Sequence, residues 1–245
     1  MIPKIIHYCW FGRKPLPKSA IKCIESWKKF FPGYEIREWN EDNFDVNQIP
    51  YTAQAYEAGK YAFVSDYARF KILYEYGGLY FDTDVEVIKP FEDILEKGPF
   101  MGFEINSSDI SFGMVAPGLG LGVNSSNDIY YKIINLYKSL SFLNENGTYN
   151  LKTVVEYTTN ILIKEGLNRI NGIQNVKGIY LYPVEYFNPF EDATGKIYKT
   201  KNTHSIHWYS KSWINRPIYY TFCSRLLHRI IGVDNSARIK KLFIK

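Results

Sequence analysis

Hydrophobic residues at the start of the chain follow two different periodicities, which together predict a strand, a helix and a second strand. Residues 2–10 are mostly apolar and β-branched, which is typical of a buried strand. In residues 19–31 the apolar side chains recur at helical spacing, and Pro32 and Gly33 end that helix. Residues 34–39 alternate as a short strand does. This order predicts a parallel βαβ unit.

Trp10 stands at the end of the first predicted strand. Ligands of parallel sheets bind beyond the carboxyl ends of the strands, so this position predicts that Trp10 lies at a binding crevice. The alternative is that Trp10 is an ordinary aromatic residue of the core.

A second long helix is predicted for residues 66–76, with Ser65 as its N-cap and Gly77 as the residue that ends it. Asp66 and Arg69 stand three positions apart, so we expect them to share one face near the positive, amino-terminal end of the helix. The alternative is a local ion pair that contributes roughly a few tenths of a kcal/mol.

Residues 77–87 join a double glycine to an apolar run, two aspartates and an alternating end, and we predict a strand here that ends before Lys89 and Pro90. Asp82 and Asp84 are two positions apart, and such residues of a strand point to the same face. We therefore expect their carboxylates to converge on one hard cation, and oxygen ligands suit Mg²⁺ or Mn²⁺. An isolated Asp-x-Asp arises by chance about once in a chain of this length, so the motif gains weight from the Asp66 and Arg69 pair upstream.

The remaining pattern is that of a single α/β domain. No internal repeat and no linker divides the chain. Further helices are expected at residues 51–58, 128–143 and 151–167, and short strands at 99–104, 110–116 and 179–182.

A polar cluster at residues 203–213 contains two of the four histidines together with a lysine and two tryptophans. Its chemistry makes His207 a candidate metal ligand and Lys211 a candidate phosphate partner. The alternative is a surface loop whose histidines have ordinary hydrogen-bond partners.

Residues 221–245 differ from the rest of the chain, because basic and apolar residues alternate and Asp234 is the only acid. A basic amphipathic stretch can lie on an anionic membrane. We favour this reading over a terminal helix packed on the domain with a solvated basic face.

The composition excludes several classes of protein. With 46% hydrophobic and 22% charged residues, the chain is neither disordered nor collagen-like. The 17% share of aromatic residues suits stacking on sugars and bases, although an aromatic-rich core would explain it equally well. A net charge of +5 favours anionic ligands without requiring nucleic acid.

Cysteine usage and the amino-terminal sequence predict a cytoplasmic protein. Cys9, Cys23 and Cys223 are odd in number and widely spaced, so we expect free thiols rather than disulfides or a zinc site. Basic residues interrupt the first apolar stretch, which argues against a signal peptide. No apolar run approaches the roughly 20 residues of a membrane span. With the basic tail, this predicts a cytoplasmic protein bound peripherally to the inner face of the cell membrane.

Residues 65–69 and 76–84 closely resemble the core of the DXD-containing sugar transferases of glycosyltransferase family 32. That family includes capsular-polysaccharide enzymes and relatives of the yeast initiating α-1,6-mannosyltransferase. The same order and spacing are similar to the glucosyltransferase domains of the large clostridial toxins. The specific match covers about residues 60–90, and residues 2–12 extend it to the first strand.

The resemblance implies an α/β protein with the GT-A fold, a Rossmann-like αβα sandwich around a central, mostly parallel sheet. Residues 1–220 would form the catalytic domain, followed by the basic tail of residues 221–245. Trp10 would stack on the nucleobase and Tyr80 would line the nucleotide pocket. Asp66 and Arg69 would bind hydroxyls of the donor sugar, with Arg69 also near the phosphate.

The resemblance also implies the metal site. Asp84 would ligate the metal directly, and Asp82 would contact ribose, sugar and metal-bound water. The segment that contains His207, Lys211 and Trp213 is similar to the C-terminal motif of the related retaining family 8, in which a histidine completes the metal site. Lys211 and Trp213 would then bind the donor, Lys211 through its diphosphate. Serines at positions 210 and 212 stand where that motif has a glycine and a proline.

The stereochemistry of the family is retaining, so the resemblance implies an α-linked product from an α-linked donor. No carboxylate in the sequence is placed as an obvious covalent nucleophile, which favours a front-face mechanism. We predict a hexosyltransferase that uses Mn²⁺ or Mg²⁺ and a nucleotide-sugar, with UDP-galactose or UDP-glucose favoured and GDP-mannose open. The expected acceptor is a surface glycan or glycolipid, such as a lipid-linked capsular or exopolysaccharide intermediate, and no nucleic acid is expected.

Two other classes of function compete with this prediction. Paired aspartates also serve nucleotidyl and phosphoryl transfer, but the chain has no phosphate-cradling glycine-rich loop and no further carboxylate cluster beside Asp84. A Ca²⁺-dependent glycan-binding module could use Asp82 and Asp84, but it would not need Asp66 and Arg69 at this spacing.

Overall fold

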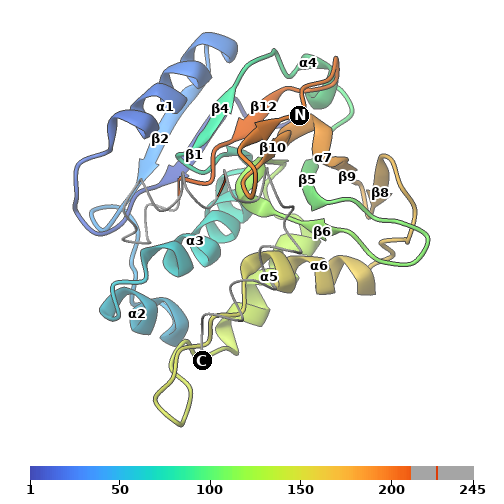
Figure 1. The fold of residues 1–245 in the computed structure, drawn as a ribbon. Coiled ribbons are helices and arrows are strands. Elements are labelled where there is room, and N and C mark those ends of the chain that lie inside the picture. The colour runs from blue at the N-terminus through green and yellow to red at the C-terminus, as the bar shows by residue number, and fades with distance from the viewer. Residues whose placement is uncertain (211–224, 226–245) are drawn as a thin grey trace.

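The computed structural model describes residues 1–210 and residue 225 (Figure 1). Their centre is one sheet in the order β2-β1-β3-β7-β5-β9-β8, with β6 paired to β5. Its strands are β1 (Ile5–Cys9), β2 (Glu35–Trp39), β3 (Gly78–Tyr80), β5 (Phe100–Ile105), β6 (Met114–Val115), β7 (Leu121–Val123), β8 (Gln174–Val176) and β9 (Ile179–Tyr182).

Helices cover both faces of this sheet, which gives three layers. Figure 1 shows α1 on one side, together with a small pair formed by β4 and β12, and α2, α3, α5 and α6 on the other. The helices are α1 (Lys18–Phe30), α2 (Pro50–Glu57), α3 (Tyr61–Tyr76), α4 (Glu92–Leu95), the 3₁₀ turn η1 (Pro117–Leu119), α5 (Asp128–Lys138), α6 (Val154–Lys164) and α7 (Val184–Phe187). The small strands are β4 (Val85–Val87), β10 (Phe190–Glu191), β11 (Lys196–Ile197) and β12 (Ser205–His207).

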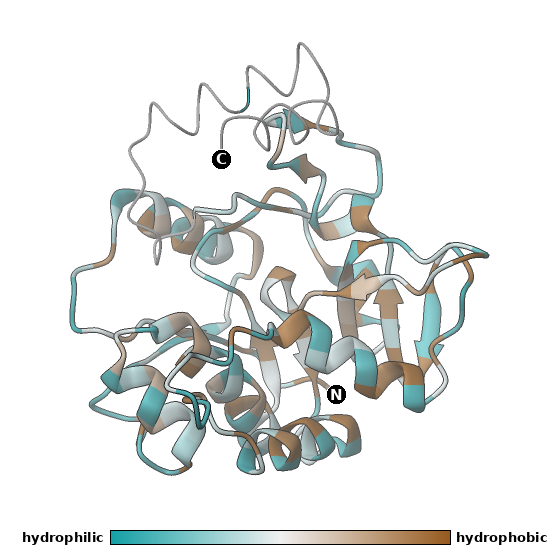
Figure 2. Ribbon diagram, turned by 60° about the horizontal axis from the view of Figure 1, so that its bottom comes forward, coloured by the Kyte–Doolittle hydropathy of each residue, from teal (hydrophilic) through white to brown (hydrophobic). Residues whose placement is uncertain are grey.

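Successive side chains along each strand point to opposite faces of the sheet, so the core is divided into two clusters. Ile6 and Tyr8 of β1 pack with Trp27 of α1, whereas Cys9 of β1 and Tyr80 of β3 belong to the cluster that includes α3 and α5. The helices carry hydrophobic and hydrophilic positions side by side (Figure 2), as helices with one face on a core do. Cys9 and Cys23 are free and buried.

The predicted βαβ unit is present, but the sheet is mixed rather than mostly parallel. β1 pairs in parallel with β2 and β3, and β5 with β9. β7 lies antiparallel between β3 and β5, and β8 is antiparallel to β9. The reason is the connection from β5 to β7, which folds back through β6 and η1 without the crossover helix that parallel neighbours usually need.

Helix α3 begins earlier than predicted. It starts at Tyr61, so Ser65 lies inside the helix and donates its hydroxyl to the Tyr61 carbonyl at 3.2 Å instead of capping the end. Asp66 is therefore in the second turn and not at the positive end. Gly77 ends the helix with a φ of 65°, as glycine at this position predicts. Helices α5 and α6 are both shorter than expected.

The double glycine lets β3 approach β1 closely. Gly78 has a φ of 99°, and a Cβ there would lie 2.7 Å from the Ile5 carbonyl oxygen and 3.2 Å from Nε2 of His7. His7 is fully buried, with Nε2 3.0 Å from the Gly77 carbonyl oxygen and with Nδ1 accepting from the Trp39 indole at 3.0 Å. Because a carbonyl only accepts, Nε2 carries the proton.

The predicted strand through the two aspartates is wrong. β3 ends at Tyr80 and β4 begins at Val85, and the amide of Val85 donates to the Asp82 carbonyl at 3.0 Å across the turn between them. β4 leaves the central sheet and pairs antiparallel with β12, which places His207 opposite Val85. The aspartates thus lie at a turn, and a distant segment is brought beside them.

Among the helices of the described residues, none has the length and the apolar character that a membrane span requires.

Candidate active site

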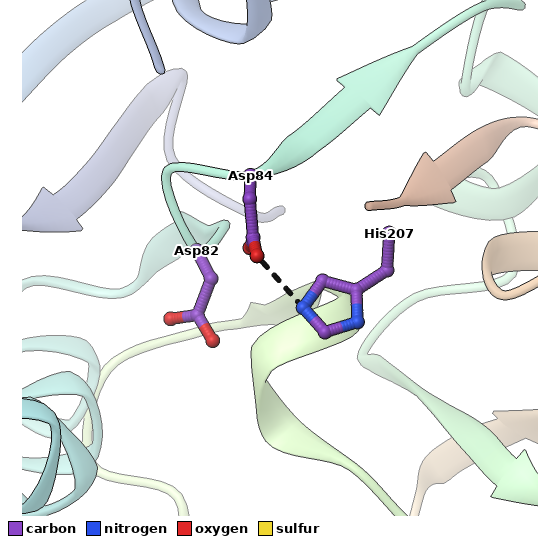
Figure 3. Close-up of side chains that lie close together, drawn as sticks. All are labelled: Asp82, Asp84 and His207. Atoms are coloured by element: carbon purple, nitrogen blue, oxygen red, sulfur yellow. Dashed lines mark ion pairs between the residues drawn. The ribbon is translucent and has the colours of Figure 1, made fainter. Parts of the chain in front are cut away.

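Two aspartates and a histidine meet where β3 and β12 end and β4 begins. Asp82 follows β3, Asp84 precedes β4, and His207 is the last residue of β12. One ligand atom from each of the three residues lies within 4.8 Å of the others, and Figure 3 shows the three side chains converging. Two carboxylates and one imidazole form a donor set that suits Mn²⁺ or Mg²⁺, so these residues fit a divalent cation.

The last residue of β12 and the residues that follow it bind Asp84. Nε2 of His207 lies 3.1 Å from Oδ1 of Asp84, and the Ser210 amide donates to Oδ2 at 2.8 Å. The Trp208 amide donates to the Asp84 carbonyl at 3.0 Å. Burial alone would raise the pKa of Asp84, but His207 and Ser210 together lower it to about 2. Burial would likewise lower the pKa of His207, and the Asp84 carboxylate raises it instead.

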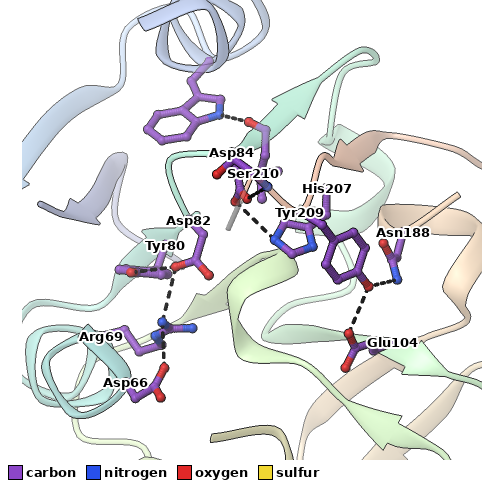
Figure 4. A network of polar contacts seen from close by, with 12 residues as sticks. Asp66, Arg69, Tyr80, Asp82, Asp84, Glu104, Asn188, His207, Tyr209 and Ser210 are labelled. Atoms are coloured by element: carbon purple, nitrogen blue, oxygen red, sulfur yellow. Dashed lines mark hydrogen bonds and ion pairs between the residues drawn. The ribbon is translucent and has the colours of Figure 1, made fainter. Parts of the chain in front are cut away.

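Asp82 belongs to a second set of contacts that runs towards α3 (Figure 4). Its Oδ1 accepts from the Tyr80 hydroxyl at 2.9 Å and lies 3.3 Å from Nη2 of Arg69. The same Nη2 donates to Oδ1 of Asp66 at 3.0 Å, and Nε donates to the Ser65 carbonyl at 3.1 Å. Arg69 is thereby fixed in one orientation between two carboxylates.

Burial and the neighbouring charges together determine the ionisation of Asp66 and Arg69. Burial raises the pKa of Asp66 to about 7, although Arg69 acts in the opposite direction. Burial alone would lower the pKa of Arg69, but Asp82, Tyr80 and Asp66 raise it, so the guanidinium stays charged. A buried positive charge beside the aspartate turn is suited to a phosphate or to sugar hydroxyls.

The structure brings six of the predicted site residues into one network: Asp66, Arg69, Tyr80, Asp82, Asp84 and His207. Trp10 is half-buried directly after β1, at the carboxyl end of the strand next to β3, and its indole donates to the Lys14 carbonyl at 2.6 Å. Its contact with a nucleobase stays a prediction. Lys211 and Trp213 lie outside the described residues, as does the tail of residues 221–245 apart from Arg225.

The sequence pattern missed four residues at the site. Gly118 of η1 is so close to Asp82 that a Cβ at this position would overlap Oδ2. Tyr209 packs on the His207 ring, and its hydroxyl donates to Glu104 at 2.9 Å and accepts from Asn188 at 2.7 Å. Glu104 is an isolated acid in an otherwise apolar predicted strand. This was the one sequence signal that could have identified it as a site residue.

Comparisons with known proteins show what the chain is similar to. Residues 17–101 match a family model described as a glycosyltransferase sugar-binding region containing a DXD motif. An uncharacterized glycosyltransferase of Acanthamoeba polyphaga mimivirus is 29% identical over 200 residues, which cover 77% of this chain and 76% of that protein. Inositol phosphoceramide mannosyltransferase 3 of Schizosaccharomyces pombe is 31% identical over 98 residues, which cover 38% of this chain and 27% of the relative.

Among solved structures, the PaToxG glycosyltransferase aligns with a TM-score of 0.50 at 23% identity, over 67% of this chain and 70% of that one. The fold is therefore that of the GT-A enzymes, an α/β architecture with helices on both faces of a mixed sheet. Together, the family match and the relatives support a glycosyltransferase that is similar to the DXD-containing, family 32 type.

Proposed function

We propose that this enzyme transfers a hexose from a nucleotide-sugar donor with retention of configuration and depends on a divalent cation. The observation that carries the proposal is the convergence of Asp82, Asp84 and His207 beside the buried Arg69–Asp66 pair. A bound Mn²⁺ or Mg²⁺ would neutralise the diphosphate leaving group. Asp84 and His207 would hold that ion, with Asp82 bridging it and the donor.

The remaining residues would bind and orient the donor. Arg69 offers a fixed positive charge, and its partner Asp66 can accept hydrogen bonds from sugar hydroxyls, which together position the ring for attack. Tyr80 lines the same side of the turn through its bond to Asp82. Trp10 would stack on the base from the end of β1, and Lys211 and Trp213 would bind the donor, Lys211 through its diphosphate.

A front-face reaction is favoured because each carboxylate around the site already has a partner. Asp66 and Asp82 contact Arg69, Asp84 contacts His207, and Glu104 accepts from Tyr209. The acceptor hydroxyl would attack the anomeric carbon on the face from which the diphosphate leaves, and a phosphate oxygen would take the proton. Detection of a glycosyl-enzyme adduct by mass spectrometry during turnover would refute this mechanism.

Calorimetry with UDP- and GDP-sugars, with and without Mn²⁺, tests the proposed activity. We expect Mn²⁺-dependent binding of a nucleotide-sugar, followed by slow hydrolysis. Asp84→Ala should remove about 100-fold or more of the metal-dependent hydrolysis while the fold is retained, whereas Asp42→Ala, at an exposed ion pair with Arg13, should not. Absence of nucleotide-sugar binding under every condition would favour the phosphoryl-transfer or glycan-binding alternatives.

For the donor, the sequence resemblance favours UDP-galactose or UDP-glucose, whereas the names of the Schizosaccharomyces relatives support a mannose donor as the competitor. The same names describe transfer to an inositol phosphoceramide, which supports a glycolipid or lipid-linked glycan as acceptor here. A hydrolysis screen over UDP-glucose, UDP-galactose and GDP-mannose distinguishes the donors.

We also propose that residues 1–220 form the catalytic domain and that residues 221–245 bring it to the cytoplasmic face of an anionic membrane. The support is the basic and apolar composition of that tail. Arg225 binds Asp192 at 2.7 Å, so the sharper test leaves it in place and replaces Arg229, Arg238 and Lys240 by glutamine. We expect loss of binding to vesicles with anionic lipids and unchanged donor hydrolysis.

A further inference from the structure

Tyr209 adopts a backbone conformation that tyrosine rarely takes. Its φ is 49°, in the left-handed region, and it lies two residues after His207. A bulky non-glycine residue remains in this region only when its surroundings determine its conformation, and such residues cluster at functional sites. The contacts that hold Tyr209 therefore indicate what its position is for.

Two anchors from separate elements fix the Tyr209 hydroxyl (Figure 4). It donates to Oε1 of Glu104 on β5 at 2.9 Å and accepts from Nδ2 of Asn188 at 2.7 Å. Asn188 follows α7 and is only 6% exposed. The ring cannot move away from its place without breaking both bonds.

The ring that is held this way lies against His207. The two ring centroids are 4.2 Å apart with an angle of 60° between the planes. A metal-binding histidine usually has its second ring nitrogen fixed by a hydrogen bond. Here Nδ1 of His207 is buried and has no hydrogen-bond partner among the described residues. Packing against Tyr209 thus takes the place of that bond in orienting the imidazole.

We propose that Tyr209 is a positioning residue: held by Glu104 and Asn188, it orients the His207 imidazole towards the cation site. It also sets the turn whose flanking amides, from Trp208 and Ser210, bind Asp84. The inference rests on the proposed function, in which His207 and Asp84 hold a divalent cation.

The test compares Tyr209→Phe with the wild type by calorimetric titration of Mn²⁺ alone and by donor hydrolysis over a range of Mn²⁺ concentrations. Phenylalanine keeps the ring and loses both anchors. We expect the Mn²⁺ dissociation constant to rise about tenfold, with kcat largely restored at saturating Mn²⁺. Asn188→Ala, which removes one anchor, should show a smaller rise and keeps the test open should Tyr209→Phe not fold.

Tyr8→Phe is the matched control, because the Tyr8 hydroxyl donates to Glu38 at 2.6 Å elsewhere on the same sheet. Its Mn²⁺ affinity should equal that of the wild type, and a similar loss there would overturn the positioning role. His207→Ala separates the two proposals. Unchanged Mn²⁺ affinity in His207→Ala would mean that the proposed cation site is wrong. Weakened affinity in His207→Ala with wild-type affinity in Tyr209→Phe and Asn188→Ala would overturn the role of Tyr209 alone.

Discussion

Gly118 sets how closely the backbone can approach the Asp82 carboxylate. A Cβ here would overlap Oδ2 of Asp82 and would lie 3.4 Å from Nη1 of Arg69. The Gly118 carbonyl also accepts from the Asp82 amide at 3.2 Å, so the two backbones are held together. An added methyl group must therefore displace the carboxylate rather than the chain.

Gly118→Ala should lower kcat/KM for donor hydrolysis by about 100-fold, because a displacement of roughly 1 Å at a reacting centre costs that much. Steady-state kinetics with the donor measures the effect. Gly147→Ala is a suitable control, since a Cβ there meets no atom within 4 Å. Its φ of 78° means that alanine costs stability rather than activity. Wild-type turnover in Gly118→Ala would show that Asp82 is not positioned by this contact.

At this scale the sequence predicted the acids and bases of the site but not the residues that shape it. Asp82, Asp84 and Arg69 stand at short, recognisable spacings. Gly118 lies against Asp82, about 36 positions away, and Tyr209 bonds to Glu104, about 105 positions away. No local pattern encodes such packing.

Helix α1 supports the strand that follows the aspartate turn. The buried Trp27 donates its indole N–H to the Val85 carbonyl at 2.8 Å, and the Ser26 hydroxyl accepts from the Val87 amide at 2.9 Å. Glu86 holds β4 from its outer side, because its carboxylate accepts from the Trp208 indole at 2.9 Å and lies 3.2 Å from the Lys22 ammonium. The turn is thus anchored from both sides.

Trp27→Phe should lower the free energy of unfolding by about 1 to 2 kcal/mol, because it removes one buried hydrogen bond while most of the aromatic packing stays. Urea unfolding measures this change. Lys28→Ala, which breaks only an exposed pair with Glu25, should change it by less than about 0.5 kcal/mol. Equal effects of the two substitutions would contradict a supporting role for the indole.

Element boundaries were predictable where a breaker residue marks them, as Gly77 does at the end of α3. The start of α3 was missed because Ser65 is a good N-cap residue but here bonds backward to Tyr61 within the helix. The split between β3 and β4 was missed as well, since alternation cannot show that a strand changes partner.

His7 makes the stability of the whole molecule depend on pH. Burial lowers its pKa from 6.5 to about 4, and Arg37 acts in the same direction, while the bond to Gly77 opposes them. The unfolded chain, with the ordinary pKa, binds more protons between these values. The contribution of neutral His7 to the free energy of unfolding is therefore fully present above about pH 6.5. It is lost as the pH falls towards 4, by roughly 3 kcal/mol in total.

His7→Gln should flatten the stability profile between pH 4 and 6.5, because glutamine can still donate to the Gly77 carbonyl but does not titrate. Urea unfolding of both proteins at pH 4.5, 5.5 and 7 gives the difference, and all other titrating groups cancel in it. Parallel profiles for the two proteins would show that His7 is not the source.

At the scale of the molecule, the GT-A fold was predicted from the resemblance to family 32, and the chain does have that fold. The direction of β7 was not, because it depends on how residues 106–120 return to the sheet. The position of the last strand was equally hidden. Nothing in the local sequence says that β12 leaves the order of the chain to pair with β4.

That pairing has a consequence for how the enzyme comes into being on the ribosome. The pairing of β4 with β12 brings His207 beside Asp84, so more than 120 residues must be synthesised after the aspartates before the third member of the set exists. The central sheet, whose last strand ends at Tyr182, is complete before β12 is made. A nascent chain that ends before β12 therefore lacks the third member of the proposed cation site, and if that proposal holds it gains metal-dependent activity only after this strand is made.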